Sequence, residues 1–272
     1  GAIDLRRRPA DHPAPRLWGV TAGAAAIGPD DEPVRPDAAA LLAFYRSAGL
    51  ELPDLAIAEI DVDPATDASA VAEELLHPGD ERRLAWRGDR RFAARLAGAG
   101  PEGAAGPLAL REDATYLVTG GLGALGRLVT AWLVERGAGR VLLAGRREPS
   151  AAERAWMGGM RGVEFERADV SRPEDVERAL ERAGASLAGV FHLAGSLEDG
   201  IVLSATPERL ERALGAKALG ARHLHEATAL RPLDLFVLFG SQTGVLGSAG
   251  QSAYAAANAW LGALAWHRRA IG

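Results

Sequence analysis

The amino-acid sequence contains no cysteine in its 272 residues. Disulfide frameworks and thiolate zinc sites are therefore excluded, we expect no metal site, and any redox chemistry in this chain requires a cofactor. The sequence also lacks an apolar signal segment at residues 1–15 and any run near the roughly 18 apolar residues that span a membrane. We therefore expect a cytoplasmic protein without a membrane partner.

The sequence has no excess of positive charge, with 31 basic residues against 36 acidic ones and a formal net charge of −5. Nucleic acid is therefore not an expected partner. Hydrophobic residues make up 48% and charged residues 25%, which is typical of a folded globular protein. Only one of the basic residues, Lys217, is a lysine. Because a lysine can change its protonation state where an arginine cannot, Lys217 is a candidate functional residue.

Two regions of different character flank a stretch rich in glycine, alanine and proline at residues 97–110, which we interpret as a linker. The region before it carries no chemical motif and is interpreted as a structural α/β layer. Its expected strands are residues 17–21 and 55–62, its expected helix is residues 37–48, and its expected hairpin pairs residues 82–87 with 91–96.

Strands and helices alternate along the region after the linker, which predicts βαβ units and a doubly wound parallel sheet of the Rossmann type. The expected strands are residues 115–119, 140–143, 163–167, 189–192 and 235–239. The expected helices are residues 124–136, 173–183, 207–229 and 251–269. Ligands of such sheets bind beyond the carboxyl ends of the strands, so the residues after each strand are the candidate site.

A glycine-rich segment, residues 119–126 (TGGLGALG), follows the first of these strands and opens a helix. It fits the G-x-G-x-x-G pattern, in which small residues permit a tight turn, a close approach of pyrophosphate and tight packing of the helix on the sheet. This context predicts a dinucleotide site at a helix N-terminus, the alternative being a tight turn without a ligand. The candidate cofactor-binding residues of the segment are Thr119, Gly120, Gly121, Gly123, Leu125 and Gly126.

The second strand is followed by Arg146 and Arg147 rather than by the acidic residue that an NAD site requires for the ribose hydroxyl. A guanidinium group suits the extra 2′-phosphate of NADP. We therefore predict NADPH as the cofactor and Arg146 as its ligand. The alternative is that these arginines are solvated surface charges.

Residues after the third and fourth strands extend the predicted nucleotide site. Asp169 could bond the adenine amino group, and Val170 could pack on the adenine ring. Ala194 and Gly195 are small enough for the chain to pass beside the cofactor. His192, at the end of the fourth strand, is interpreted as a packed or hydrogen-bonded histidine rather than a catalytic one.

Ser241, Tyr254 and Asn258 follow the fifth strand and are candidate reactive residues. A spacing of four places Tyr254 and Asn258 on one face of the last expected helix, and Ser241 emerges at the same sheet edge as the glycine segment. Two hydroxyl groups beside a nicotinamide are what carbonyl reduction requires, because one holds the developing alkoxide and the other protonates it.

Lys217 belongs to a stripe of residues at helical spacing, which predicts that its side chain points inward. The stripe consists of Leu210, Leu214, Lys217, Ala221 and Leu224. An ammonium group about 4 Å from the Tyr254 phenolate would lower the pKa of that phenol, since the attraction is roughly 4 kcal/mol at an effective dielectric constant near 20. Tyr254 would then be a competent acid near neutral pH. The alternative is that Lys217 extends to solvent from the edge of the core.

With these residues in place, the sequence resembles the ketoreductase domains of modular polyketide synthases, which are members of the short-chain dehydrogenase/reductase superfamily. The segments that carry the resemblance are residues 116–126 (YLVTGGLGALG), 189–199 (GVFHLAGSLED) and 238–259 (LFGSQTGVLGSAGQSAYAAANA). Most members of the superfamily carry a lysine four residues after the tyrosine, where this sequence has Asn258. A lysine on the preceding helix, such as Lys217, is typical of the polyketide ketoreductases.

The resemblance implies an enzyme that uses NADPH to reduce a β-ketoacyl thioester to a β-hydroxyacyl thioester. The acyl chain would be carried on the phosphopantetheine arm of an acyl carrier protein, with the other domains of a synthase module as further partners. Tyr254 would donate the proton, and Ser241 would hold the ketone oxygen. Lys217 and Asn258 would order the tyrosine, the ribose and a water relay.

The resemblance also bears on the hand of the product, through Asp199 and Leu246. Family members that make the D-configured alcohol resemble one another in a Leu-Asp-Asp sequence after the fourth strand, where this chain has Leu197, Glu198 and Asp199. Members of the opposite hand tend to carry a tryptophan eight residues before the tyrosine, where this chain has Leu246. A D-configured product is therefore favoured.

By the same resemblance, residues 1–106 would be a structural, non-catalytic subdomain and residues 107–272 an NADPH-binding catalytic subdomain. We expect the first to be incomplete at its N-terminus and the second to lack its C-terminal lid. Two alternatives remain open. One is a catalytically silent scaffold domain of a synthase, and the other is a free-standing short-chain dehydrogenase that acts on a small alcohol.

Overall fold

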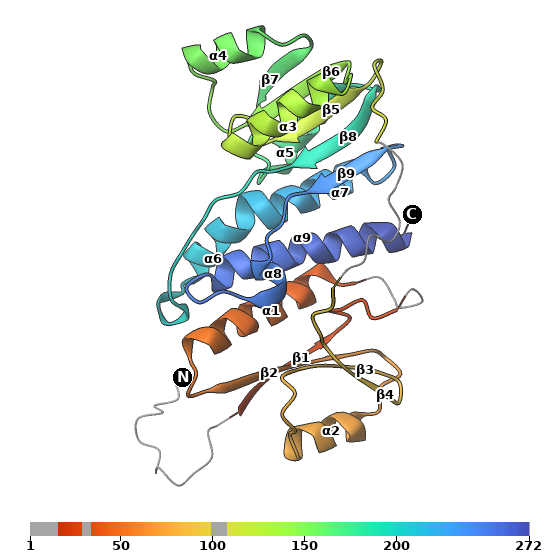
Figure 1. The fold of residues 1–272 in the computed structure, drawn as a ribbon, viewed down its shortest axis with the longest axis vertical. Helices are drawn as coiled ribbons and strands as arrows, with labels where there is room; N and C mark the ends of the chain where they lie inside the picture. Colours follow the sequence, from red (N-terminus) through yellow and green to blue (C-terminus); the bar gives the residue numbers. More distant parts are fainter. Residues whose placement is uncertain (1–15, 29–33, 99–107, 272) are drawn as a thin grey trace. The chain divides into compact units, whose positions relative to one another are not determined.

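The computed structural model describes residues 16–28, 34–98 and 108–271 (Figure 1). Contacts between residues divide the chain into two compact units. The first comprises residues 1–97, 198–207 and 240–272, and the second comprises residues 98–197 and 208–239. Residues 1–15, most of the expected linker and the expected boundary at residue 106 lie outside the described residues, so the predicted subdomain limits stay predictions.

The second unit is built on a five-stranded parallel sheet with the strand order β7-β6-β5-β8-β9. Its strands are β5 (Thr115–Thr119), β6 (Arg140–Gly145), β7 (Val163–Arg167), β8 (Leu187–His192) and β9 (Leu235–Leu238). The order reverses at β5, so the carboxyl ends of β5 and β8 flank the position where doubly wound sheets bind ligands. The predicted α/β fold with a parallel sheet is confirmed.

Helices cover both faces of this sheet. Successive residues of a strand point to opposite sides, so a strand that is apolar throughout needs a helix on each face. The helices are α3 (Ala124–Glu135), α4 (Ala151–Gly158), α5 (Pro173–Ala183), α6 (Pro207–Leu214) and α7 (Gly220–Thr228). Leu117 of β5 packs in one core cluster with Leu180 of α5 and Leu224 of α7. Its neighbour Tyr116 packs in the other cluster with Leu133 of α3. Strand β5 is therefore buried on both sides.

Two helical features of the second unit differ from the sequence expectation. Helix α4 was not expected, because its eight residues are too few for a helical period to stand out in the sequence; a capping box between Ser150 and Glu153 starts it. The expected helix at residues 207–229 is interrupted, since a π-helical turn, Gly215–Leu219, separates α6 from α7. The turn contains Lys217, and π-helical turns occur frequently at functional sites.

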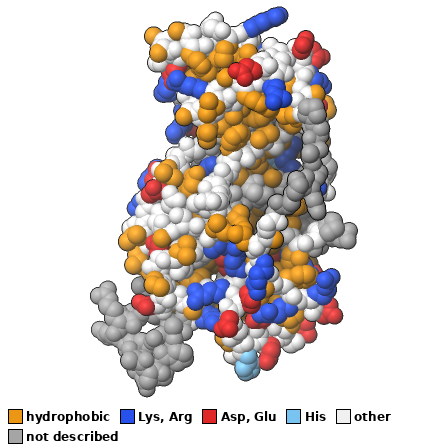
Figure 2. Space-filling model, in the orientation of Figure 1, with side chains coloured by type: hydrophobic (Ala, Val, Ile, Leu, Met, Phe, Trp, Pro, Cys, Tyr) orange, Lys and Arg blue, Asp and Glu red, His pale blue; other side chains and the backbone are white. Residues whose placement is uncertain are grey.

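Apolar side chains are exposed on one face of α3. Leu125 is 59% exposed and Leu128 is 67% exposed. Figure 2 shows hydrophobic side chains gathered on the part of the surface where α3 lies. This face of α3 therefore adds nothing to the core of the second unit, although the opposite face packs on the sheet through Leu133.

The first unit contains a four-stranded sheet with the order β1-β2-β3-β4, in which β4 is antiparallel and the other strands are parallel. Its strands are β1 (Arg16–Ala22), β2 (Ala56–Val62), β3 (Arg83–Arg87) and β4 (Arg90–Ala93). Its helices are α1 (Pro36–Glu51), α2 (Ala68–Leu76), α8 (Thr243–Leu246) and α9 (Ser252–Ile271). Helix α1 packs along α9, and the Trp260 indole donates a 2.8 Å hydrogen bond to Asp37. The short helices α2 and α8 were not expected from the sequence.

None of the helices in the described ranges is both long and apolar enough to cross a membrane. Helix α9 has 20 residues, yet its last turn carries Arg268 and Arg269. The same part of the chain holds no group of three or more histidine, aspartate or glutamate side chains arranged for a metal ion.

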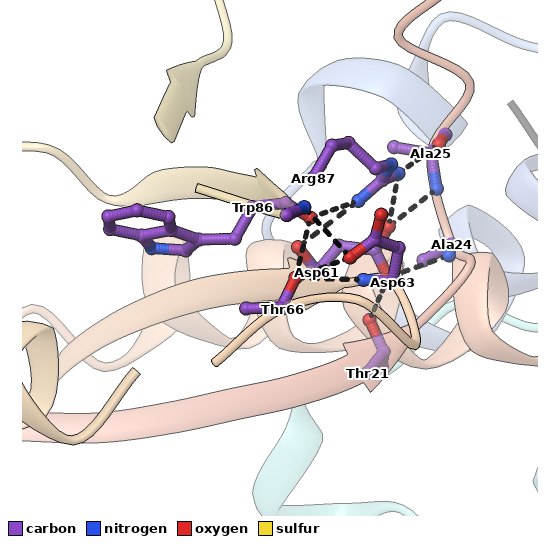
Figure 3. A network of polar contacts seen from close by, with 9 residues as sticks. Thr21, Ala24, Ala25, Asp61, Asp63, Thr66, Trp86 and Arg87 are labelled. Atoms are coloured by element: carbon purple, nitrogen blue, oxygen red, sulfur yellow. Dashed lines mark hydrogen bonds and ion pairs between the residues drawn. The ribbon is translucent and has the colours of Figure 1, made fainter. Parts of the chain in front are cut away.

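A polar network closes the carboxyl end of the sheet in the first unit (Figure 3). Asp61, near the end of β2, is 1% exposed and accepts a 2.8 Å hydrogen bond from the Thr21 hydroxyl. The backbone N–H groups of Ala24 and Ala25 donate to the same carboxylate at 2.7 and 3.2 Å. Arg87 adds a 2.9 Å ion pair. The loop after β1 thus directs its N–H groups at a carboxylate of the chain itself, at the edge where a dinucleotide-binding sheet receives phosphate.

Replacing Asp61 by asparagine should destabilise the first unit. The amide retains one acceptor oxygen but loses the charge that pairs with Arg87, and removing one partner of a buried ion pair costs about 3–5 kcal/mol. Urea unfolding followed by tryptophan fluorescence measures the change in free energy of unfolding. Asp89→Asn, in the exposed turn between β3 and β4, is the control, and equal unfolding midpoints for the two variants would contradict this role of Asp61.

Candidate functional site

A cleft opens at the carboxyl edge of the sheet in the second unit. The residues that line it are Gly120, Ala144, Gly145, Arg146, Ala168, Asp169, Val170, Ala194, Gly195 and Ala216. Six of them are predicted cofactor residues, which the structure brings to one place. The other four were missed, although they are small residues within two positions of a predicted site residue. For Ala144, Gly145 and Ala168, the position at the end of a strand was the signal that could have found them, whereas Ala216 lies in the π-helical turn.

The glycine segment is held so close to the neighbouring strand ends that side chains have no room. Gly120 has a φ of +70°, and a Cβ atom added to it would lie 2.9 Å from the backbone nitrogen of Ala194. A Cβ atom on Gly121 would lie 2.8 Å from a leucine side chain of β6, and one on Gly126 would lie 2.6 Å from the Cα atom of Gly121. Gly123 is the N-cap of α3 and offers no side-chain cap. The first N–H groups of α3 therefore have no capping side chain at this end of the helix.

Arg146 and Arg147 follow each other after β6 but have different partners. Arg147 makes two 2.7 Å hydrogen bonds to the carboxylate of Glu153, which also accepts a 2.7 Å hydrogen bond from Arg127. The bonds from Arg147 hold the pKa of Glu153 well below its usual range. Arg146 instead lines the cleft, and its guanidinium makes no ion pair within the described residues. Of these two arginines, only Arg146 lines the cleft.

Asp169 and Val170 form the wall of the cleft beyond β7. The Oδ1 atom of Asp169 accepts hydrogen bonds from the backbone N–H (3.0 Å) and the hydroxyl (2.7 Å) of Ser171, which fix the orientation of the carboxylate. Val170 is 5% exposed and belongs to the core cluster of α5. Leu125 is not among the residues that line the cleft, so its predicted contact with the cofactor stays a prediction.

Lys217 is buried in the second unit, with 6% of its surface exposed, as the stripe at helical spacing predicts. Its Nζ atom donates a 2.9 Å hydrogen bond to the backbone carbonyl of Phe239, just after β9. A Cβ atom added to Gly195 would lie 3.0 Å from the Cε atom of Lys217. Because Gly195 and Ala216 both line the cleft, the lysine lies directly beside it. Burial lowers the pKa of the ammonium group, since removal from water disfavours the charged form.

His192 ties the π-helical turn of Lys217 to the sheet. The Nε2 atom lies 2.9 Å from the carbonyl oxygen of Lys217, and Nδ1 lies 2.7 Å from the hydroxyl of Thr119. A carbonyl oxygen can only accept, so Nε2 carries the proton and Nδ1 accepts from Thr119. The Thr119 oxygen in turn accepts from the N–H of Ala194 at 3.3 Å. Burial lowers the pKa of His192 to about 4, and the ring is therefore neutral at neutral pH.

Ser241, Tyr254 and Asn258 lie in the first unit. Asn258 is 3% exposed and donates a 2.7 Å hydrogen bond from Nδ2 to the backbone carbonyl of Tyr254. Its Oδ1 atom is buried and accepts no hydrogen bond within the described residues. A Cβ atom added to Gly240 would lie 4.0 Å from that oxygen. The Ser241 hydroxyl oxygen accepts a 3.3 Å hydrogen bond from the backbone N–H of Thr243 at the start of α8.

Asp199 and Leu246 belong to the same unit. Asp199 accepts a 3.0 Å hydrogen bond from the side-chain amide of Gln251, just before α9. The N–H of Gly200 donates to the carbonyl of Gly250 at 2.8 Å. Leu246 is the last residue of α8 and is 46% exposed. The structure thus joins the loop of Asp199 to the segment that leads into α9. That Asp199, Leu246 and the reactive residues form one site with Lys217 and the glycine segment stays a prediction.

Two family models match most of the chain between them. The model described as a KR domain matches residues 114–272. The chain belongs to the ketoreductase domains of polyketide synthases. The model described as the Rossmann fold domain of the polyketide synthase extender module SpnB matches residues 4–96. The family resemblance that the sequence motifs predicted is confirmed, and the ketoreductase is an oxidoreductase domain of the short-chain dehydrogenase/reductase type.

Curated relatives of the ketoreductase are polyketide synthase proteins. It is 42% identical over 270 residues to a phenolphthiocerol/phthiocerol polyketide synthase protein of Mycobacterium tuberculosis (strain CDC 1551 / Oshkosh), which covers 95% of the chain and 15% of that protein. It is 40% identical over 269 residues to the spectinabilin polyketide synthase system protein NorA of Streptomyces orinoci, which covers 94% of the chain and 14% of that protein. The chain therefore spans about 15% of the length of these relatives.

Solved ketoreductase structures share the fold. A structure of A-type ketoreductases from a modular polyketide synthase has a TM-score of 0.84 and 40% sequence identity, covering 96% of this chain and 57% of that chain. A C2-type ketoreductase from a modular polyketide synthase has a TM-score of 0.82 and 30% identity, covering 93% of this chain and 55% of that chain.

The neutral, buried His192 should make the stability of the ketoreductase depend on pH. The pKa of this histidine is about 4 in the folded chain against an ordinary value of 6.5. Between these values the unfolded chain binds a proton that the folded chain does not, so the free energy of unfolding falls as the pH drops from 6.5 towards 4. The full difference corresponds to about 3 kcal/mol.

Urea unfolding at a series of pH values measures this effect, and His192→Gln isolates it. The glutamine amide can donate to the Lys217 carbonyl and accept from Thr119 but does not titrate. We expect a shallower loss of stability with acid in the variant than in the natural chain. Parallel pH profiles for the two proteins would contradict the assignment.

Proposed function

We propose that this ketoreductase uses NADPH to reduce the β-keto group of an acyl chain to a β-hydroxyl group, with the chain held as a thioester on an acyl carrier protein. The observation that carries the proposal is Lys217. The one lysine of an arginine-rich sequence is buried beside a cleft, with its ammonium group on the carbonyl of Phe239, which orients the group but does not neutralise its charge. Stabilising a tyrosinate during proton transfer uses this charge.

The cleft of the second unit has the features that a dinucleotide requires. The backbone of Gly120 and the open N-terminus of α3 suit the pyrophosphate, because N–H groups and the helix dipole favour negative charge. Arg146 pairs with the 2′-phosphate, while Arg147 is held by Glu153. The Asp169 carboxylate accepts a hydrogen bond from the adenine amino group. When bound there, NADPH supplies the hydride for the reduction.

The reacting residues act on the ketone oxygen, which gains negative charge as a C–H bond forms at the neighbouring carbon. The Tyr254 hydroxyl transfers its proton to that oxygen, so an O–H bond forms and the ketone becomes an alcohol. The Ser241 hydroxyl donates a hydrogen bond to the same oxygen. The ammonium group of Lys217 stabilises the tyrosinate. The buried Oδ1 atom of Asn258 accepts from the water that returns a proton to Tyr254.

Asp199 and Leu246 orient the substrate in this proposal. Asp199 belongs to the loop that is joined to the start of α9 through Gln251, and Leu246 occupies the place of a tryptophan that accompanies the opposite hand. The product is therefore the D-configured alcohol. The substrate arrives on the phosphopantetheine arm of the carrier protein, and the other domains of a synthase module are the remaining partners, in keeping with relatives that are polyketide synthase proteins.

Replacing Arg146 by alanine should weaken the binding of NADPH by about 10- to 100-fold, because a hydrogen bond to a charged group contributes about 1.5–3 kcal/mol. The binding of NADH, which lacks the 2′-phosphate, should change little. Fluorescence titration measures both dissociation constants. Arg147→Ala is the matched control, since the same charge is removed one residue away. An equal loss of NADPH affinity in the two variants would contradict the proposed role of Arg146.

Replacing Tyr254 by phenylalanine should lower kcat by at least about 100-fold, because a positioned general acid contributes about 10²- to 10⁴-fold. NADPH binding should be unchanged, since the substitution removes only the hydroxyl. The loss of absorbance at 340 nm with a β-ketoacyl thioester mimic measures turnover, and chiral separation of the product determines its configuration. Tyr45→Phe, which removes a hydroxyl on α1, is the control and should keep full activity.

The same assay separates the proposal from the scaffold alternative. A silent scaffold would neither bind NADPH nor oxidise it with any β-ketoacyl thioester, in the natural chain as in the variants. Reduction of simple ketones at the same rate as thioesters would instead favour a free-standing dehydrogenase. If the Tyr254→Phe variant reduces the thioester as fast as the natural chain does, Tyr254 is not the proton donor.

A further inference from the structure

The Glu51 carboxylate lies at the end of its helix where negative charge is unfavourable. Glu51 is the last residue of α1, where the partial negative charge of the helix end disfavours a carboxylate. The last turn of α1 contains no basic residue that would offset this charge. A carboxylate at such a place requires another source of stabilisation.

Two backbone N–H groups from distant segments stabilise the Glu51 carboxylate. The N–H of Val202 donates to Oε2 at 2.6 Å, and the N–H of Gly250 donates to Oε1 at 2.9 Å. Val202 lies three residues after Asp199, and Gly250 lies four residues before Tyr254. One carboxylate thus joins the loop of the predicted stereocontrol residue to the segment that leads to the predicted proton donor.

Other side chains of α1 hold the rest of the segment between Ser241 and Tyr254. Arg46 donates 3.0 Å hydrogen bonds to the backbone carbonyls of Gly244 and Val245 in α8. The Ser47 hydroxyl oxygen accepts a 3.2 Å hydrogen bond from the N–H of Ser248. Because these partners are backbone groups, the contacts set the path of the segment whatever side chains it displays.

The Arg46 guanidinium is itself fixed by the sheet of the first unit. It makes hydrogen bonds of 3.0 and 2.7 Å to the two carboxylate oxygens of Glu59 on β2, which is 4% exposed. A bidentate pair of this kind fixes the plane of the guanidinium. The path of α8 is therefore set by β2 and α1.

We propose that Glu51 is a positioning residue for substrate recognition. Through Glu51, helix α1 sets the position of the Asp199 loop and of the segment before Tyr254. The proposal rests on the proposed ketone reduction. It adds a specificity-determining residue that touches neither substrate nor cofactor. Loss of the carboxylate frees two backbone N–H groups at once, so the Asp199 loop and the segment before Tyr254 are no longer held to the end of α1, although Gly200–Gly250 and Asp199–Gln251 still link them to each other.

Amide hydrogen exchange tests the joint directly and does not depend on activity. In Glu51→Ala, the N–H groups of Val202 and Gly250 should exchange at least tenfold faster than in the natural chain. In Glu51→Gln, the single remaining acceptor oxygen should leave one of the two protected. Glu73→Gln, on the exposed surface of α2, is the matched control. Unchanged exchange at both amides in Glu51→Ala would overturn the proposal.

Steady-state kinetics tests the consequence for substrate recognition. Glu51→Gln and Glu51→Ala should raise the KM for a β-ketoacyl thioester mimic by about tenfold and lower the stereochemical purity of the alcohol, with a smaller change in kcat. The dissociation constant of NADPH, whose predicted ligands lie in the other unit, should stay within twofold. A general loss of folded protein would lower the rate without changing KM or product configuration, and that result would overturn the positioning role.

Failure of the two hypotheses can be told apart. If the natural chain does not reduce the thioester, the proposed function is wrong, and the substrate role of Glu51 is wrong with it. Faster exchange in the variants would then still establish the joint as a structural one. If the natural chain is active and the variants keep its KM and product ratio, only the role of Glu51 is overturned.

Discussion

A buried ammonium group must obtain its solvation from protein atoms, and this requirement at Lys217 shapes the cleft around it. The carbonyl of Phe239 accepts from the ammonium group, so β9 must end where that carbonyl points at the lysine. The chain passes close to the lysine at Gly195, where an added Cβ atom would lie 3.0 Å from the lysine side chain. His192 holds the backbone of the same turn. Residues of the sheet, of the π-helical turn and of the cleft thus all contact Lys217.

The first unit meets a different requirement, which is that irregular backbone must find hydrogen-bond partners when it is partly buried. The segment between Ser241 and Tyr254 contains a single helical turn, α8, and several of its backbone groups have their partners outside the segment. Side chains of α1 supply these partners from Arg46, Ser47 and Glu51. Helix α1 thereby fixes the path of an irregular segment through contacts with its backbone.

Local features of the molecule could be predicted from the sequence. The turn of the glycine segment and the strands of the second unit depend on neighbouring residues, and the burial of the Lys217 side chain follows from helical spacing. These predictions agree with the structure. The short helices α4 and α8 were missed because eight and four residues are too few for a helical period to stand out. The π-helical turn was missed because it adds no distinctive residue to the sequence.

Long-range contacts could not be predicted in the same way. Glu51 is separated by 151 residues from Val202 and by 199 residues from Gly250. Nothing in the local sequence of either segment indicates the other. The pairing of Arg147 with Glu153 spans only six residues, but it depends on helix α4, which the sequence did not predict.

Asp61 has a consequence for the whole chain. Its carboxylate is covalently attached to the strand beside the loop after β1, so its effective concentration at the N–H groups of Ala24 and Ala25 far exceeds that of any dissolved nucleotide. A competing phosphate would also have to separate Asp61 from Arg87. A dissolved nucleotide is therefore not expected to displace Asp61 and bind at this edge of the first unit. Damage to the glycine segment of the second unit is not compensated at this sheet edge of the first.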